Sequence, residues 1–361
     1  MSRFQLSALL LTTLGCLTSI LFGVSGLSGP NPNKEVSLIA DANDPHQKNF
    51  IVIAHRGASG YLPEHTFAAY ALAHGMGADF IEQDLVLTKD DQVVVLHDIH
   101  LDTVTDVSKQ FPDRGREDGR FYAVDFTLEE IKSLRVHERV DHETGKSVFS
   151  ERFPSSTAVF QIPTLQEAIE LVEGMNQSTG RSVGLYPEIK KPAWHRSQGK
   201  DISSIVLKTL KEHGYTFKSD NIYLQCFDPL ELKRIRNDLD CQLKLVQLIG
   251  SNDWTESQVD YNQLVTESGL KDIAKYADGI GPWMPYIVDG VSADGKPQMT
   301  KLVQWAKQNH LAVHPFTFRA DSLPDYADSF DELMVIFKFA GVDGVFTDHC
   351  DRAIDHAGGK N

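Results

Sequence analysis

The sequence predicts an α/β fold: a closed (β/α)8 TIM barrel with an insertion after the second strand region. Short apolar segments alternate with helical segments about eight times along the chain, and such alternation is typical of parallel strands joined by right-handed helical crossovers. The chain has 361 residues, of which 41% are hydrophobic. This is enough for a barrel of this class, which typically uses about 250 residues as one unit.

The expected strands and helices follow one another in order. Short apolar, β-rich segments predict strands at 50–54, 79–86, 183–189, 222–226, 243–248, 277–280, 311–316 and 343–347. The segments between them predict helices at 65–76, 164–175, 202–213, 229–237, 262–276, 299–309 and 326–340. At the start of the helix 164–175, Thr164 can cap the backbone and Glu167 follows three residues later, which is the pattern of a capping box.

One interval breaks this alternation. Residues 99–162 contain no clear strand–helix unit and carry polar, basic and aromatic side chains instead. A segment of this length within a compact domain is usually functional or forms a subdomain of its own. Because it follows the second strand region, we expect this insertion on the rim of the barrel, over the active site.

The N-terminus has the features of a targeting segment. Arg3 supplies a short basic region, residues 6–24 are strongly apolar, and Val24-Ser25-Gly26 offers a cleavage site. We therefore expect four regions: a signal peptide at 1–26, a flexible linker at 27–48, the barrel at 49–355 and a tail at 356–361. An uncleaved membrane anchor or a lipid anchor at Cys16 is the alternative. The prediction is an exported protein, periplasmic or secreted, with no stable membrane partner after signal cleavage.

The charge of the chain limits its partners. A formal net charge of −15 argues against binding to nucleic acid or to an anionic membrane surface. An anionic substrate would need a bound metal or local cations to reverse the field at its site.

Three cysteines lie beyond the leader, and this odd number excludes a complete set of disulfides. Cys226 and Cys241 fall near adjacent strands and could pair. We nevertheless expect Cys226, Cys241 and Cys350 to be buried free thiols.

Charged residues follow the apolar segments at several strand ends, where barrel enzymes place their reactive side chains. The clusters are His55-Arg56-Gly57, Glu82-Gln83-Asp84, His97-Asp98 and Glu188-Ile189-Lys190. Glu82 and Asp84 are two residues apart on a strand, so their side chains point the same way, and Glu188 ends the third barrel strand. Three carboxylates suit an oxygen-ligated divalent metal, for which we expect Ca²⁺, with Mg²⁺ as the alternative. Solvated strand-end carboxylates are the structural alternative.

His55 and His97 form a candidate acid/base pair, because an imidazole pKa of about 6.5 suits proton transfer at neutral pH. Arg56 has the geometry to bind two phosphate oxygens, and Lys190 can act as a point charge on a third. Both cations could instead pair with the carboxylates. Trp283 and Phe316, after the sixth and seventh strands, could form a wall of the substrate pocket or serve only in packing. Together these groups predict metal-assisted phosphoryl transfer.

These motifs resemble the glycerophosphodiester phosphodiesterase family, most closely its periplasmic glycerophosphodiester branch. The resemblance spans nearly all of the chain after residue 49, and residues 111–126 also resemble the insertion of this branch. The matching stretches are His55-Arg56-Gly57-Ala58-Ser59-Gly60-Tyr61-Leu62-Pro63-Glu64-His65-Thr66, Glu82-Gln83-Asp84-Leu85, Val94-Val95-Leu96-His97-Asp98, Tyr186-Pro187-Glu188-Ile189-Lys190, Tyr223-Leu224-Gln225-Cys226-Phe227-Asp228, His314-Pro315-Phe316-Thr317-Phe318-Arg319 and Gly344-Val345-Phe346-Thr347-Asp348.

The resemblance implies a role for each matching residue. Three carboxylates would be metal ligands, two histidines the acid/base pair and two cations the phosphate contacts: Glu82, Asp84 and Glu188; His55 and His97; Arg56 and Lys190. Glu64 resembles the family glutamate that supports the arginine or the metal. Two positions depart from the branch, since Cys226 stands where Thr is common and Phe316 stands in for Tyr.

The implied activity is hydrolysis of small glycerophosphodiesters, such as glycerophosphocholine or glycerophosphoethanolamine, to sn-glycerol 3-phosphate and an alcohol. The attacking group could be water or the neighbouring glycerol hydroxyl, which would give a cyclic phosphate first. Two alternatives are a phospholipase acting on lyso or intact phospholipids and a non-catalytic exported binding protein. No strongly amphipathic stretch in the insertion offers the landing surface that a phospholipase needs.

Overall fold

The computed structural model describes residues 50–154, 157–293 and 295–357. Within these residues, eight parallel strands lie side by side in the order β10-β7-β6-β5-β4-β2-β1-β11. Their bounds are β1 (Ile51–Ala54), β2 (Phe80–Leu87), β4 (Gly184–Ile189), β5 (Tyr223–Cys226), β6 (Lys244–Ile249), β7 (Gly279–Pro282), β10 (Ala312–Val313) and β11 (Gly344–Thr347).

Backbone hydrogen bonds connect the two outer strands of this order. Phe346 N–H donates to Pro315 O at 3.0 Å, and Phe318 N–H donates to Phe346 O at 2.9 Å. The sheet is therefore nearly closed, and the predicted (β/α)8 barrel is confirmed.

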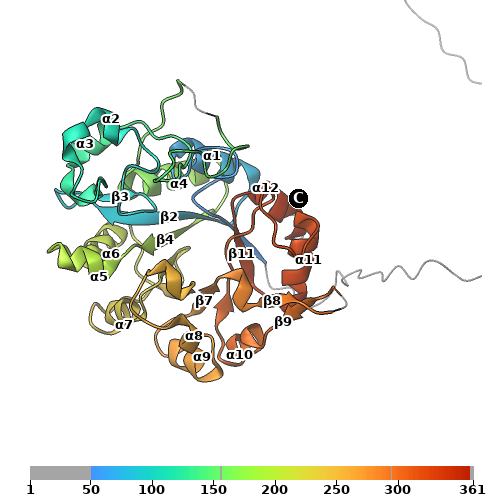
Figure 1. Ribbon diagram of the computed structural model, residues 1–361. Helices are drawn as coiled ribbons and strands as arrows, with labels where there is room; N and C mark the ends of the chain where they lie inside the picture. Colours follow the sequence, from blue (N-terminus) through green and yellow to red (C-terminus); the bar gives the residue numbers. More distant parts are fainter. Residues whose placement is uncertain (1–49, 155–156, 294, 358–361) are drawn as a thin grey trace, which may run out of the picture. The chain divides into compact units, whose positions relative to one another are not determined.

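Helices surround the strands (Figure 1). They are α1 (Phe67–Met76), α4 (Leu165–Thr179), α5 (Pro192–Ser197), α6 (Ile202–Glu212), α7 (Pro229–Asn237), α8 (Tyr261–Leu264), α9 (Glu267–Ile273), α10 (Leu302–Gln308), α11 (Phe330–Ala340) and α12 (Cys350–His356). The predicted capping box is present, because Glu167 N–H donates to Thr164 Oγ1 at 3.1 Å and Thr164 N–H donates to Glu167 Oε2 at 2.8 Å. The expected helix 262–276 is divided in two, since Thr266 starts a new helix by accepting from Gly269 N–H at 3.0 Å.

The interior of the barrel is filled with apolar side chains. Five strands each contribute one residue to a buried cluster formed by Ile53, Phe80, Tyr186, Val246 and Phe346. Phe80 lies on the same face of β2 as Glu82 and Asp84, because side chains alternate along a strand. The cluster therefore forms a packed floor beneath the carboxylates.

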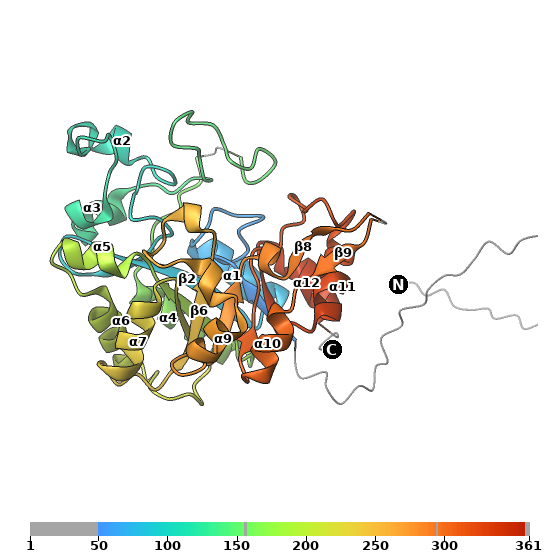
Figure 2. The ribbon, with the colours of Figure 1, turned by 60° about the horizontal axis from the view of Figure 1, so that its bottom comes forward.

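The insertion, residues 99–162, has a core of its own. Its elements are α2 (Val107–Gln110), the 3₁₀ turns Pro112–Arg114 and Ala123–Asp125, and α3 (Leu128–Ser133). A second buried cluster joins them to β3 (Val93–Val95); its largest members are Leu101, Phe121, Phe126 and Ile131. Figure 2 shows α2 and α3 gathered at one end of the barrel, as expected for an insertion that follows the second strand region.

Three local expectations were wrong or incomplete. His97 does not follow a barrel strand: it follows β3, which pairs antiparallel with the end of β2. The hairpin of β8 (Val288–Val291) and β9 (Pro297–Met299) was not expected. The expected strand 311–316 is paired as a regular strand only over Ala312–Val313, because Pro315 has no N–H to donate.

Other expectations concern the N-terminal segments, a membrane anchor and the cysteines. The predicted signal peptide and linker, 1–26 and 27–48, lie outside the described residues. Among the helices of the described part, none is long and apolar enough to cross a membrane. Cys226, Cys241 and Cys350 are buried free thiols, as expected.

Candidate active site

A pocket of about 330 Å³ opens at the C-terminal ends of the barrel strands. Its lining includes all but one of the predicted site residues; the members are His55, Arg56, Glu82, Asp84, His97, Glu188, Lys190, Gln225, Phe227, Leu248, Trp254, Glu256, Trp283, Phe316, Arg319 and Phe346. Glu64 is the predicted residue that does not line the pocket. The structure thus brings together side chains that lie up to 291 positions apart in the sequence, from His55 to Phe346.

Three buried carboxylates form the centre of this pocket. Asp84 on β2 lies in register with Glu188 on β4, and Glu82 extends from the same face of β2 as Asp84. Each of the three side chains offers an oxygen within 4.8 Å of the others. A set of carboxylate oxygens this close suits a divalent cation such as Ca²⁺ or Mg²⁺.

The electrostatics of the three carboxylates also favour a bound cation. Burial and the neighbouring Asp84 raise the pKa of Glu82 well above its ordinary value, and burial raises the pKa of Glu188. Asp84 differs: against the effect of burial, Lys190 and His97 hold its pKa well below the usual range. Asp84 Oδ1 is buried and accepts no hydrogen bond from the residues that the structure describes. A divalent cation would satisfy this oxygen and relieve the repulsion between the carboxylates.

Arg56 and Lys190 contact the carboxylates directly. Arg56 has a left-handed backbone with φ of 59°, which directs its N–H to Glu82 Oε2 at 2.9 Å. Its guanidinium lies 3.5 Å from Asp84 Oδ2 and 3.0 Å from Glu64 Oε2. Lys190 Nζ lies 2.8 Å from Glu188 Oε1. The ion pairing with carboxylates that the sequence left open is therefore present.

Each of the two histidines is held by its own carboxylate. His55 Nδ1 donates to Asp348 Oδ1 at 2.6 Å, and His97 Nδ1 donates to Asp98 Oδ1 at 2.6 Å. Both rings consequently turn Nε2 toward the charged groups: His55 Nε2 is 3.8 Å from Glu82 Oε2, and His97 Nε2 is 3.5 Å from Lys190 Nζ. A neutral imidazole with one nitrogen occupied in this way has a defined tautomer.

The pKa values of both histidines are depressed. Burial and the adjacent Arg56 lower the pKa of His55 to about 4. Burial, Arg56 and Lys190 lower the pKa of His97 to about 4. Both rings are therefore neutral at pH 7, and either can accept a proton at Nε2.

Several side chains around these groups were missed by the sequence analysis. His65 Nε2 donates to Asp84 Oδ2 at 2.8 Å, and Gln225 Nε2 donates to Glu82 Oε1 at 3.1 Å. Asp98 and Asp348 hold the two histidines. All four residues stand within the motifs quoted above, and that membership was the available signal.

An apolar wall faces the charged groups. Trp283 and Phe316 both belong to it, and Trp254 joins them with ring centroids 5.1 Å from Trp283 and 6.3 Å from Phe316. Glu256 also lines the pocket and pairs with Lys191 at 3.3 Å. The wall therefore combines aromatic faces with one negative charge.

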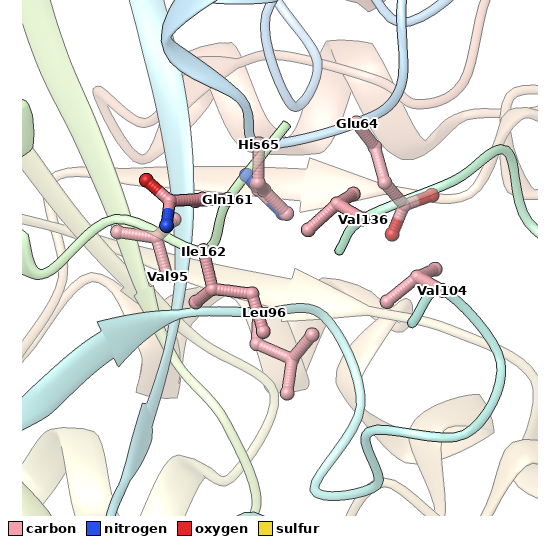
Figure 3. A pocket seen from close by; sticks show the side chains of 8 residues that line it. All are labelled: Glu64, His65, Val95, Leu96, Val104, Val136, Gln161 and Ile162. Carbon is pink, nitrogen blue, oxygen red and sulfur yellow. The ribbon is translucent and has the colours of Figure 1, made fainter. Parts of the chain in front are cut away.

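Behind the pocket, Glu64 and His65 border a second, very small cavity of about 10 Å³. Figure 3 shows the two side chains beside apolar residues: Val95 at the end of β3, Leu96 directly after it, and Val104 and Val136 of the insertion. Glu64 contacts arginines here: Arg56 from the pocket side and Arg139 from the insertion, at 3.0 and 2.6 Å.

Comparisons with known proteins identify the family of the chain. The chain matches the profile of the glycerophosphoryl diester phosphodiesterase family over residues 55–352. A glycerophosphodiester phosphodiesterase of Haemophilus influenzae is 44% identical and the match covers 87% of this chain and 91% of that protein. A glycerophosphodiester phosphodiesterase of Treponema pallidum is 38% identical, with 85% and 92% covered.

Two solved structures share the fold. The structure of an Oleispira antarctica phosphodiesterase in complex with the product sn-glycerol-3-phosphate has a TM-score of 0.57 at 19% identity and covers 85% of this chain and 96% of that one. The glycerophosphodiester phosphodiesterase of Thermotoga maritima has a TM-score of 0.53 at 19% identity, with 86% and 99% covered. On the profile match and the identities, this chain belongs to the glycerophosphoryl diester phosphodiesterase family of hydrolases.

Proposed function

We propose that this enzyme hydrolyses small glycerophosphodiesters to sn-glycerol 3-phosphate and an alcohol, with a divalent metal held by Glu82, Asp84 and Glu188. The observation that carries the proposal is the pairing of two carboxylate-held histidines with this carboxylate cluster inside one pocket. The names of the two bacterial relatives and the product bound to the Oleispira antarctica enzyme support the same substrate class.

In the proposed mechanism, Arg56 and Lys190 bind the phosphate oxygens and balance the charge that grows on them. One histidine takes the proton of the attacking oxygen at Nε2 as the new P–O bond forms. The other histidine gives a proton to the departing alcohol oxygen as the old P–O bond breaks. This histidine enters the step protonated at Nε2, because the bound phosphate anion favours the charged form of the ring. A metal bound at the carboxylates would polarise the phosphoryl oxygens as a Lewis acid; we propose Ca²⁺ and keep Mg²⁺ as the alternative.

Two routes fit this scheme. Water can attack the phosphorus directly, or the glycerol hydroxyl next to the phosphoester can attack first and give a cyclic glycerol phosphate that water then opens. Quenching a reaction early and recording phosphorus NMR separates the routes, because the cyclic phosphate has its own resonance.

We propose that the alcohol part of the substrate lies against the aromatic wall formed by Trp254, Trp283 and Phe316. A trimethylammonium group gains from aromatic faces by cation–π attraction, and Glu256 adds a negative charge nearby. Glycerophosphocholine carries this trimethylammonium group, and glycerophosphoethanolamine carries a primary ammonium. We expect Trp283→Leu to raise KM more for glycerophosphocholine than for glycerophosphoglycerol. Equal changes in KM for both substrates would contradict the proposed contact between the headgroup and the aromatic wall.

The central experiment is an assay of metal-stripped protein with added Ca²⁺ or Mg²⁺ against a panel of glycerophosphodiesters and lysophosphatidylcholine. We expect turnover of the glycerophosphodiesters to sn-glycerol 3-phosphate. Turnover of lysophosphatidylcholine alone would identify a phospholipase, and binding without turnover of any substrate would identify an exported binding protein.

We also propose that the protein is exported, on the basis of the basic and apolar N-terminal pattern at 1–26. Expression of the full chain followed by separation of periplasm, medium and membranes tests this. Recovery of uncleaved protein in the membrane fraction would point to an anchor instead.

A further inference from the structure

Two arginines of the insertion, Arg139 and Arg152, lie next to the active site. Arg139 Nη1 donates to Asp98 Oδ2 at 2.6 Å, and Arg152 Nη2 donates to Asp348 Oδ2 at 2.7 Å. Their side chains are 15% and 5% exposed, so both are substantially enclosed. The two aspartates that they reach are the same two that hold His97 and His55.

We propose that the insertion is part of the catalytic apparatus, with Arg139 and Arg152 as positioning residues that fix the two histidine–aspartate pairs. The proposal rests on the function proposed above. It assigns to residues 99–162 a role in orienting the proton-transfer groups, rather than only covering the pocket.

Arg139 links three functional groups. Besides Asp98, its Nη2 and Nε donate to Glu64 Oε1 at 2.6 Å and Oε2 at 3.0 Å. Glu64 in turn accepts from Arg56 at 3.0 Å. A single guanidinium therefore ties the carboxylate that orients His97 to the one that orients Arg56. A bidentate arginine–carboxylate contact fixes direction as well as distance.

Arg152 acts on the opposite histidine. It also donates to Asp321 Oδ2 at 2.8 Å, and its guanidinium lies 3.6 Å from the centroid of the Phe149 ring. The ion pair with Asp321 and the contact with the Phe149 ring both restrain the Arg152 guanidinium. Arg319 Nε shares Asp348 Oδ2 at 2.7 Å, so Asp348 keeps one cationic partner when Arg152 is lost. We therefore expect a smaller effect from Arg152 than from Arg139.

The physical need for the arginines follows from burial. Asp98 and Asp348 must stay ionised and fixed to accept the Nδ1 proton of each histidine, and a buried carboxylate without a partner is costly. If Arg139 is removed, Asp98 keeps the hydrogen bond from Thr103 Oγ1 at 2.9 Å but loses its charged partner in the insertion, so the Asp98 carboxylate and the His97 ring are held less firmly. Arg56 keeps its contacts with Glu64 and Asp84 when Arg139 is lost, so phosphate binding is largely retained and the loss falls on kcat more than on KM.

The first test replaces Arg139 and Arg152 with Gln and measures glycerophosphocholine hydrolysis. We expect kcat to fall roughly 10- to 100-fold for Arg139→Gln, less for Arg152→Gln, with KM nearly unchanged. Arg120→Gln is the matched control, because Arg120 forms an ion pair with Asp102 at 2.6 Å within the same insertion but does not touch the site. Equal effects from all three variants would overturn the proposal.

A double-mutant cycle tests whether Arg139 acts through Asp98. If it does, Arg139→Gln adds little further loss to an Asp98→Asn background. Losses that multiply would show that Arg139 acts independently, and would overturn the assignment. If Arg139→Gln does not fold, Arg139→Lys serves in its place, because lysine keeps the charge but not the bidentate fork; we expect an intermediate kcat.

A substrate with a p-nitrophenol leaving group distinguishes a positioning role of the two arginines from a general loosening of the fold. Such a leaving group needs no proton donor, so loss of the general acid costs little. We expect one arginine variant, the one serving the acid, to recover most of its activity and the other to remain slow. If both arginine variants lose as much activity on the p-nitrophenol substrate as on glycerophosphocholine, the proposal is contradicted. Failure of the wild-type enzyme on every glycerophosphodiester would instead contradict the proposed function.

Discussion

At the scale of single residues, each of the two histidines proposed as acid and base has one ring nitrogen held by an aspartate and the other turned into the pocket. Asp348 and Asp98 occupy Nδ1 of His55 and His97 at 2.6 Å, so Nε2 is the atom left for proton transfer. Burial and neighbouring cations keep both rings neutral at pH 7. In the empty pocket both Nε2 atoms can therefore accept a proton, and the substrate pose decides which histidine acts as base.

Replacing His97 with alanine tests its part in proton transfer. We expect His97→Ala to lower kcat roughly 10²- to 10⁴-fold, because a positioned acid or base contributes about that much. KM should change little. The matched control is His213→Ala, at the C-terminal cap of α6 and away from the pocket. A loss confined to KM would make His97 a binding residue.

At the scale of elements, strand register assembles the proposed metal site. The β2–β4 pairing sets Asp84 beside Glu188, and the two-residue period of β2 adds Glu82. The geometry of neighbouring parallel strands, rather than any flexible loop, therefore determines the spacing of the three carboxylates.

Metal binding should be visible without an activity assay. We expect Ca²⁺ added to chelator-treated protein to raise the melting temperature, because the ion binds only the folded carboxylate cluster. The shift should shrink as pH falls, since Glu82 and Glu188 have raised pKa values and must lose protons to bind. Glu188→Gln should remove most of the shift, and Glu212→Gln, an exposed residue at the end of α6, should leave it intact. A shift that persists in Glu188→Gln would place the ion elsewhere.

The sequence predicts the elements of this fold better than their connections. Glu82, Asp84, Glu188 and His55 were identified because each stands in or directly after an apolar strand. The antiparallel pairing of β3 with β2 was missed, because three valines next to a turn do not show which strand they pair with. Arg139 and Arg152 were missed because no local pattern marks them: their partners Asp98 and Asp348 lie 41 and 196 positions away, and only tertiary folding brings them together.

The β1–β11 pairing depends on close backbone approach at Gly344. A Cβ added there would lie 2.4 Å from Ile51 O and 2.4 Å from Ile51 Cγ1. We expect Gly344→Ala to destabilise the fold by about 1–3 kcal/mol, the usual cost of overpacking, in a urea-unfolding experiment. Gly174→Ala is the matched control, because nothing lies within 4 Å of its added Cβ in the exposed face of α4. For Gly174→Ala we expect the free energy of unfolding to rise by roughly 0.5–1 kcal/mol.

At the scale of the whole molecule, the barrel buries several histidines in neutral form, and not all of them belong to the site. His314 is fully enclosed beneath the pocket, where its Nδ1 accepts from Tyr186 Oη at 2.8 Å. Burial lowers the pKa of His314 to about 4. His195, against the end of β2, has a pKa lowered to about 4 by burial as well. We therefore expect the barrel core to be sensitive to acid.

Stability should consequently fall as pH drops from about 6.5 toward 4. In this window the unfolded chain binds a proton on each such histidine and the folded chain does not, so the free energy of unfolding decreases with decreasing pH. For His314 alone the decrease between pH 7 and pH 5 is at most about 2 kcal/mol. Urea titrations at both pH values measure it. His314→Gln keeps an acceptor for Tyr186 but cannot titrate, so its loss of stability should be smaller by about that amount. His310→Asn, at an exposed position, should keep the wild-type slope. An unchanged slope in His314→Gln would mean that this histidine is protonated without unfolding, and that the tight packing around it relaxes to admit the charge.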